Sequence, residues 1–92
     1  MGFTKESAVS AAKKDLAKRL KIGEKEIGSG SVSDSDFPDM ALGAPGKGEM
    51  AGQMISSGWT IKLNAGGKDY EYRADRDQLR LKDFEGKNHK VG

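Results

Sequence analysis

Three aspartates, one histidine and a glycine-rich segment are the features of this 92-residue chain that suggest chemistry. Asp34, Asp36 and Asp39 are close enough in sequence to form a paired-carboxylate or calcium site. Glycosidase-type catalysis needs one carboxylic acid whose pKa is raised by an apolar pocket, but these three lie among serines. The segment DSDFPDM also lacks the mid-loop glycine and the terminal glutamate of an EF-hand loop. We therefore expect a solvated acidic loop.

The chain contains one histidine, His89, and no cysteine. Without a second histidine or a thiolate, neither a zinc site nor a histidine-based catalytic triad can be assembled. The absence of cysteine also excludes disulfides and is compatible with a reducing compartment. We expect no metal, no cofactor and no enzymatic activity.

The segment GAPGKGEMAG resembles a phosphate-binding loop but fails in detail. A Walker A motif places Ser or Thr after its Gly-Lys pair, whereas Gly48 follows Lys47 here. The segment also lacks a strong strand before it and a helix after it, so nucleotide binding is disfavoured.

Helical spacing marks the first structural element. Val9, Ala12, Leu16 and Leu20 form an apolar stripe, with Ala8 beside it. Thr4 can cap the start, and the spacing predicts a helix over 5–21. Gly23 is the expected left-handed stop. We expect an edge strand near 26–33 and a long loop at about 34–52.

Apolar residues alternate on both sides of Asn64-Ala65-Gly66-Gly67, which predicts a hairpin. A two-residue loop at Ala65-Gly66 would pair Ile61 with Tyr70. A four-residue loop, 65–68, would pair Leu63 with Tyr70 and Ile61 with Tyr72. Either register places the large apolar side chains on one face, so an even loop is favoured.

These segments predict a single α+β domain spanning 1–92. One N-terminal helix would pack on a three- to four-stranded antiparallel β-meander whose last strand is 78–82. Residues 4–82 would be the ordered core, and 83–92 a flexible tail. The predicted core residues are Val9, Leu16, Leu20, Ile27, Trp59, Ile61, Leu63, Tyr70, Tyr72, Leu79 and Leu81.

Charge is distributed unevenly along the chain. The net charge is +2, but residues 1–23 carry six basic and two acidic residues (+4), and residues 24–51 carry two basic and six acidic residues (−4). The basic helix suggests nucleic-acid binding as an alternative function, through Lys13, Lys14, Lys18, Arg19 and Lys21. A solvated basic helix explains the same residues, because the predicted sheet leaves no aromatic stacking platform.

Residues 37–75 resemble a family of small, mostly uncharacterised bacterial domains with the pattern W-P-D-x-[SA]-L-G-C-P, then P-G-[YF]-x-I-x-L, then Y-E-Y-x-x-D. The resemblance covers about 8–81 and rests on FPD and LGAP in the first block, GWTIKL in the second and YEYRAD in the third. It implies a similar fold and no established activity. The family often has a cysteine in LGCP and another near the last strand, whereas this chain has Ala44 at the first position. The resemblance therefore implies that other contacts hold the loop, such as inward packing of Pro38, Leu42 and Met50.

The best functional hypothesis is a non-enzymatic module that binds a protein or peptide. The candidate contacts are Asp39, Met40, Met50, Gln53 and Arg73, although Asp39 could instead cap a turn and Arg73 could pair with Glu71 or Asp69. A regulator resembling a protease inhibitor is a further alternative. We expect a cytoplasmic location, because the chain shows no signal peptide, no cysteine and no apolar run long enough to span a membrane. We also expect a monomer.

Overall fold

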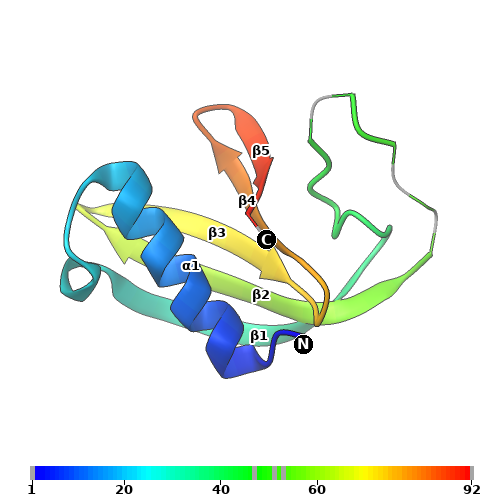
Figure 1. Ribbon diagram of the computed structural model, residues 1–92, viewed down its shortest axis with the longest axis horizontal. Coiled ribbons are helices and arrows are strands. Elements are labelled where there is room, and N and C mark those ends of the chain that lie inside the picture. The colour runs from blue at the N-terminus through cyan, green and yellow to red at the C-terminus, as the bar shows by residue number, and fades with distance from the viewer. Residues whose placement is uncertain (1, 47, 51, 53, 92) are drawn as a thin grey trace.

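The computed structural model describes residues 2–46, 48–50, 52 and 54–91. It contains one helix, a short 3-10 turn and an antiparallel sheet (Figure 1). The elements are α1 (Lys5–Leu20), η1 (Glu24–Glu26), β1 (Gly28–Phe37), β2 (Ser56–Ala65), β3 (Lys68–Ala74), β4 (Leu79–Phe84) and β5 (Lys87–Lys90). The α+β fold predicted from the sequence is confirmed.

Both ends of α1 are set by local contacts. Thr4 caps the start, because its hydroxyl accepts from the Ser7 amide while its own amide donates to the Ser7 hydroxyl. The helix ends in left-handed Lys21, with φ of 57°. The predicted left-handed stop at Gly23 is wrong. The Gly23 amide instead donates to the Glu26 carboxylate at 2.9 Å and begins η1.

The strands follow one another in the order β1-β2-β3-β4-β5, so every neighbouring pair is a hairpin or a longer antiparallel connection. In the central hairpin Leu63 lies opposite Tyr70 and Ile61 opposite Tyr72. This is the second of the two registers predicted from the sequence. Pairing continues to Ala65 and Lys68, which leaves a two-residue turn, Gly66-Gly67, with φ of 58° and 81°. Two successive positive φ angles explain the glycine pair, since they match a type I′ turn.

Five strands form the sheet, one more than the upper number predicted. The segment 83–92, assigned to a flexible tail, instead contains the end of β4 and all of β5. Its composition gave little strand signal, because β5 consists of Lys87, Asn88, His89 and Lys90. Phe84 and Val91, on either side of β5, pack against the core. Strand β1 likewise extends to Phe37, so the long loop begins after that residue and ends at β2.

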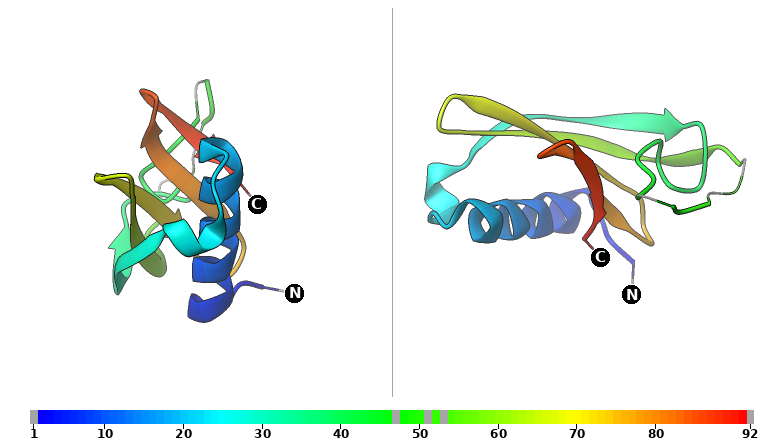
Figure 2. Two further views of the ribbon diagram at one scale, coloured as in Figure 1. Left: turned by 90° about the vertical axis from the view of Figure 1, so that its left-hand side faces the viewer. Right: turned by 90° about the horizontal axis from the view of Figure 1, so that it is seen from above.

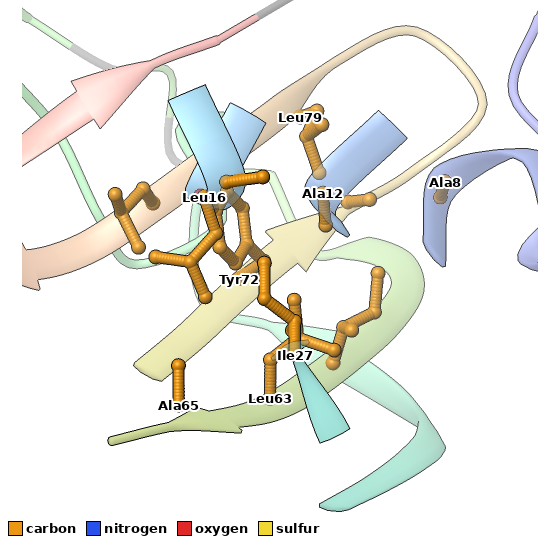
Figure 3. Packing of buried hydrophobic residues seen from close by; sticks show 12 residues of the cluster. Ala8, Ala12, Leu16, Ile27, Leu63, Ala65, Tyr72 and Leu79 are labelled. Carbon is orange, nitrogen blue, oxygen red and sulfur yellow. The ribbon is translucent and has the colours of Figure 1, made fainter. Parts of the chain in front are cut away.

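The main core lies between α1 and one face of the sheet (Figure 2). Figure 3 shows Ala12 and Leu16 of the helix clustered with Leu63 and Tyr72 of the strands. Of the predicted core, Val9, Leu20, Trp59 and Tyr70 are only partly buried, and the other seven residues are buried. Small helix residues complete the cluster, because Ala8 and Ala12 let the backbone of α1 approach the sheet closely.

A second buried cluster lies on the opposite face of the sheet. Strand side chains alternate between faces, so Phe37, Arg73 and Arg80 point away from the helix, whereas Tyr72 and Leu81 point towards it. Among the described residues of the loop that joins β1 to β2 (38–55), Ala41, Leu42 and Ala44 are buried in this cluster. The first half of the loop is therefore packed against the sheet.

Candidate functional site

Two arginines of the sheet fix the first half of the β1–β2 loop. Arg73, on β3, donates from Nη1 to the carbonyl oxygen of Leu42 at 2.9 Å and from Nε to Glu71 Oε2 at 2.7 Å. Its guanidinium also lies over the ring of Phe37, 5.4 Å from the ring centroid. Arg73 thus joins β1, β3 and the loop, which is a positioning role.

Arg80, on β4, makes the more deeply buried connection. Its side chain is 4% exposed, and its two terminal nitrogens contact both carboxylate oxygens of Glu49 at 2.6 and 2.8 Å. It also donates to the carbonyl oxygen of Ala44 and to Gln78 Oε1. A bidentate ion pair of this kind fixes the relative orientation of the two side chains in addition to the attraction between their charges. The hydrogen bond from Arg80, followed by that from the Gly46 amide, lowers the pKa of Glu49 from 4.5 to about 2.

Polar side chains complete the anchoring of this half of the loop. Asp39 Oδ1 accepts from the amides of Ala41 and Gly43, each at 2.9 Å, and so closes a turn within the loop. Gln78 donates to the carbonyl oxygen of Met40, and Asn88 donates to that of Pro45. The loop therefore contacts β3, β4 and β5.

Large apolar side chains are exposed along the same connection. The exposed fractions are 50% for Met40, 95% for Met50, 66% for Met54 and 76% for Ile55. Among the described residues, these are the exposed large hydrophobics of the protein. The predicted inward packing is confirmed for Leu42, which is fully buried, and is wrong for Met50 and Pro38, which are exposed. The main-chain carbonyl groups and Asp39 form their hydrogen bonds on the inner side of the loop. The methionine side chains lie on its outer side.

The candidate contacts predicted from the sequence separate into two groups. Asp39 and Arg73 make internal contacts that hold the loop, whereas Met40 and Met50 face solvent. Gln53 lies outside the described residues. Lys14 and Lys18 of α1, and Lys21 directly after it, are exposed and are distant from the loop in sequence. Figure 1 shows the C-terminal end of α1 on the side of the molecule away from the loop. Arg19 is paired with Asp15 at 2.7 Å and is not a free basic contact; Lys13 is partly buried.

A partly buried polar cluster joins α1 to the sheet. The Tyr72 hydroxyl donates to Asp15 Oδ2 at 2.7 Å, and Arg19 Nε contacts the same oxygen. Burial, and then the neighbouring Asp15 carboxylate, raise the pKa of Tyr72 far above its usual range. The hydroxyl therefore stays protonated and acts as a hydrogen-bond donor. In the part of the chain that the structure describes, no group of three or more His, Cys, Asp or Glu residues could hold a metal ion.

Two open hollows mark the surface. One, of about 380 Å³, is lined by Asp34, Ser35, Asp36, Ser57, Gly58 and Trp59 at one end of β1 and β2. The other, of about 470 Å³, lies between the tips of two hairpins and is lined by Tyr70, Phe84 and mostly charged neighbours. Both are open to solvent, and neither contains a catalytic constellation.

Sequence reasoning missed Glu49, Gln78 and Arg80. Alternation in QLRLK places the side chain of Arg80 on the other face of the strand from Leu79 and Leu81. This alternation was the available signal that Arg80 lies on the second face of the sheet. Its partner Glu49 is far away in sequence and lies in a segment without periodicity. Nothing in local sequence pattern links the two.

Comparisons with known proteins give one match. A family model described as a domain of unknown function (DUF8738) matches residues 9–82. No curated protein and no solved structure matches the chain. None of the described helices is both long and apolar enough to cross a membrane.

Proposed function

The chain belongs to the DUF8738 family, whose function is unknown, and on that premise we propose that it is a non-enzymatic module that binds an apolar segment of a protein partner. The binding surface is the outer side of the β1–β2 loop. The observation that carries the proposal is that the exposed large hydrophobics of the described residues, Met40, Met50, Met54 and Ile55, all belong to this one connection.

The construction of the loop supports this role. Arg73 and Arg80 hold its inner side through main-chain carbonyls and Glu49, and Leu42 is buried beneath it. A loop held by a rigid scaffold can present side chains in a fixed place, which is how binding loops commonly work. The anchoring therefore lowers the conformational entropy lost on binding at Met40 and Met50, which directly follow the anchored Asp39 and Glu49. Met54 and Ile55 directly precede β2.

The side chains indicate the chemistry of the partner. Methionine is flexible and polarisable, and it adapts to apolar surfaces of different shape. Exposed apolar groups that gather on one surface segment typically mark interaction sites. The matching partner is an amphipathic peptide or a protein surface that offers leucine-like or aromatic side chains.

Selection from a random-peptide library displayed on phage tests the proposal. Peptides selected by the wild type should be rich in apolar side chains and should lose most of their affinity for Met50→Lys/Met54→Lys. Both methionines are exposed, so this variant should fold normally. A matched variant, Lys14→Met/Lys18→Met, places apolar side chains elsewhere and should bind the selected peptides as the wild type does. Selected peptides that bind both variants equally would contradict the proposal.

Nucleic-acid binding is a second candidate, favoured by exposed Lys14 and Lys18, which are four residues apart on α1, and by exposed Lys21 directly after the helix. If these residues bind a polyanion, affinity for double-stranded DNA or RNA should fall steeply with salt. Binding that is absent, or unchanged between low and moderate salt, would eliminate this candidate.

A further inference from the structure

Strand β1 is a free edge of the sheet. It contains ten residues and pairs only with β2. Among the described residues, no backbone hydrogen bond joins its outer side to another segment. A regular register runs from Ser31 to Phe37, after an irregularity between Ser29 and Ser31. This stretch therefore presents unpaired amides and carbonyls in the spacing that a further strand requires.

The two edges of the sheet differ in their protection. The opposite edge, β5, is only four residues long and has Lys87 and Lys90 at its ends. Short length and lysines are the usual means by which edge strands avoid pairing with other chains. In β1 the stretch 31–37 has neither proline nor lysine, and its charged residues are both acidic, Asp34 and Asp36. The edge at β1 is thus open and carries a single sign of charge.

Asp34 and Asp36 share one face with the hollow of about 380 Å³. Asp34 lies opposite Trp59 and Asp36 lies opposite Ser57 across the β1–β2 pair. Gly58 must be glycine, because a Cβ atom there would collide with the carbonyl oxygen of Ala74. Gly58 lies between Ser57 and Trp59 in the lining of the hollow.

The acidic side chains remain accessible to a ligand. Asp34 is 82% exposed, and its contact with Lys5 Nζ at 3.3 Å is between two exposed groups. Such surface pairs contribute little stability, so another cation can replace Lys5. Asp36 accepts one hydrogen bond from the Ser57 hydroxyl and is otherwise exposed.

We propose that β1 binds an extended peptide as an additional strand, and that the peptide carries Lys or Arg at alternate positions. Side chains directly opposite each other in paired strands lie about 4.5–5.5 Å apart at Cβ. Basic residues at positions i and i+2 would therefore face Asp36 and Asp34 across the outer edge of β1. The intervening residues would face Ser33 and Ser35, which are small and polar and accept many side chains.

This site is separate from the methionines of the β1–β2 loop. Met50→Lys/Met54→Lys should therefore leave binding at β1 unchanged. This variant therefore distinguishes failure of the proposed binding at the β1–β2 loop from failure of the proposed binding at β1.

Titration of the ¹⁵N-labelled protein with a capped nonapeptide that alternates threonine and lysine tests the inference. Chemical-shift changes and new amide-exchange protection should concentrate at 31–37. Asp34→Lys/Asp36→Lys should weaken binding about tenfold or more, as expected for two partly exposed ion pairs that are reversed. Asp69→Lys/Asp77→Lys changes the net charge equally at exposed sites on other elements and should bind as the wild type does.

Two control peptides separate strand pairing from attraction of charge. A peptide with N-methyl groups on three successive central residues keeps every charge but loses donors on both edges, and it should bind much more weakly. A peptide with glutamate in place of lysine should not bind.

Three results would overturn the inference. The first is equal binding of the N-methylated peptide, because charge alone would then explain the affinity. The second is no binding of the probe, or shifts that map to other strands. The third is concentration-dependent protection of 31–37 without peptide, because a second copy of the chain would then occupy the edge.

Discussion

The contact between Glu49 and Arg80 makes the anchoring of the β1–β2 loop sensitive to acid. Glu49→Gln keeps the shape of the side chain and removes its charge, so it isolates the electrostatic part of the contact. Arg80 is almost fully buried, and it loses the charge of its carboxylate partner in this variant. The free energy of unfolding should therefore fall.

The pKa of Glu49 gives the size and the pH range of the effect. The carboxyl has a pKa of about 2 in the folded protein against 4.5 as a reference, and each unit corresponds to about 1.4 kcal/mol. The side chain is 34% exposed, so solvent screening reduces the full value, and we expect about 1–2 kcal/mol. Because folding lowers the pKa, this stabilisation is complete above pH 4.5 and is lost as the pH falls towards 2.

Urea unfolding of the wild type and of Glu49→Gln at pH 7, 4 and 3 measures the difference. The two proteins should differ at pH 7 and converge as the wild-type carboxyl becomes protonated. Glu85→Gln, at an exposed glutamate of the β4–β5 turn, should match the wild type throughout. A difference that stays constant from pH 7 to pH 3, or that is absent at pH 7, would refute the reasoning.

Three further substitutions test the packing, each measured as the free energy of unfolding in urea. Leu42→Ala should lower it by about 2–4 kcal/mol, because Leu42 is fully buried although it lies in a loop. Tyr72→Phe should lower it by about 1 kcal/mol, because Asp15 loses one donor and keeps Arg19. Gly58→Ala should lower it by about 1–3 kcal/mol, because the added methyl group meets the carbonyl oxygen of Ala74.

Each of these has its own check. Gly46→Ala should be nearly neutral, because the nearest atom to the new Cβ would be Glu49 Oε1 at 3.7 Å; an equal loss at both glycines would remove the steric explanation for Gly58. A loss below about 0.5 kcal/mol for Leu42→Ala would mean that the loop does not pack as described. No change for Tyr72→Phe would mean that water replaces the hydroxyl at Asp15.

Local sequence determined α1 and the central hairpin. The start of the helix follows from Thr4 and an apolar stripe of period 3.6, and the faces of β2 and β3 follow from a period of two. An even loop was required to keep Ile61 and Leu63 on the same face as Tyr70 and Tyr72. These features depend on neighbours within a few residues, so they can be read directly from the chain.

Tertiary structure decided β5 and the conformation of the β1–β2 loop. Strand β5 is polar and pairs because β4 offers it an edge, not because its residues favour a strand. The loop has no period, and its conformation depends on Arg73, Arg80 and Gln78, which lie 31 to 38 residues from their loop partners. Contacts between such distant residues arise only after the sheet has brought them together. The sequence identified Asp39 as a turn residue and Met40 as an adaptable contact. Only the packed loop shows that Asp39 makes internal hydrogen bonds and that Met40 faces solvent.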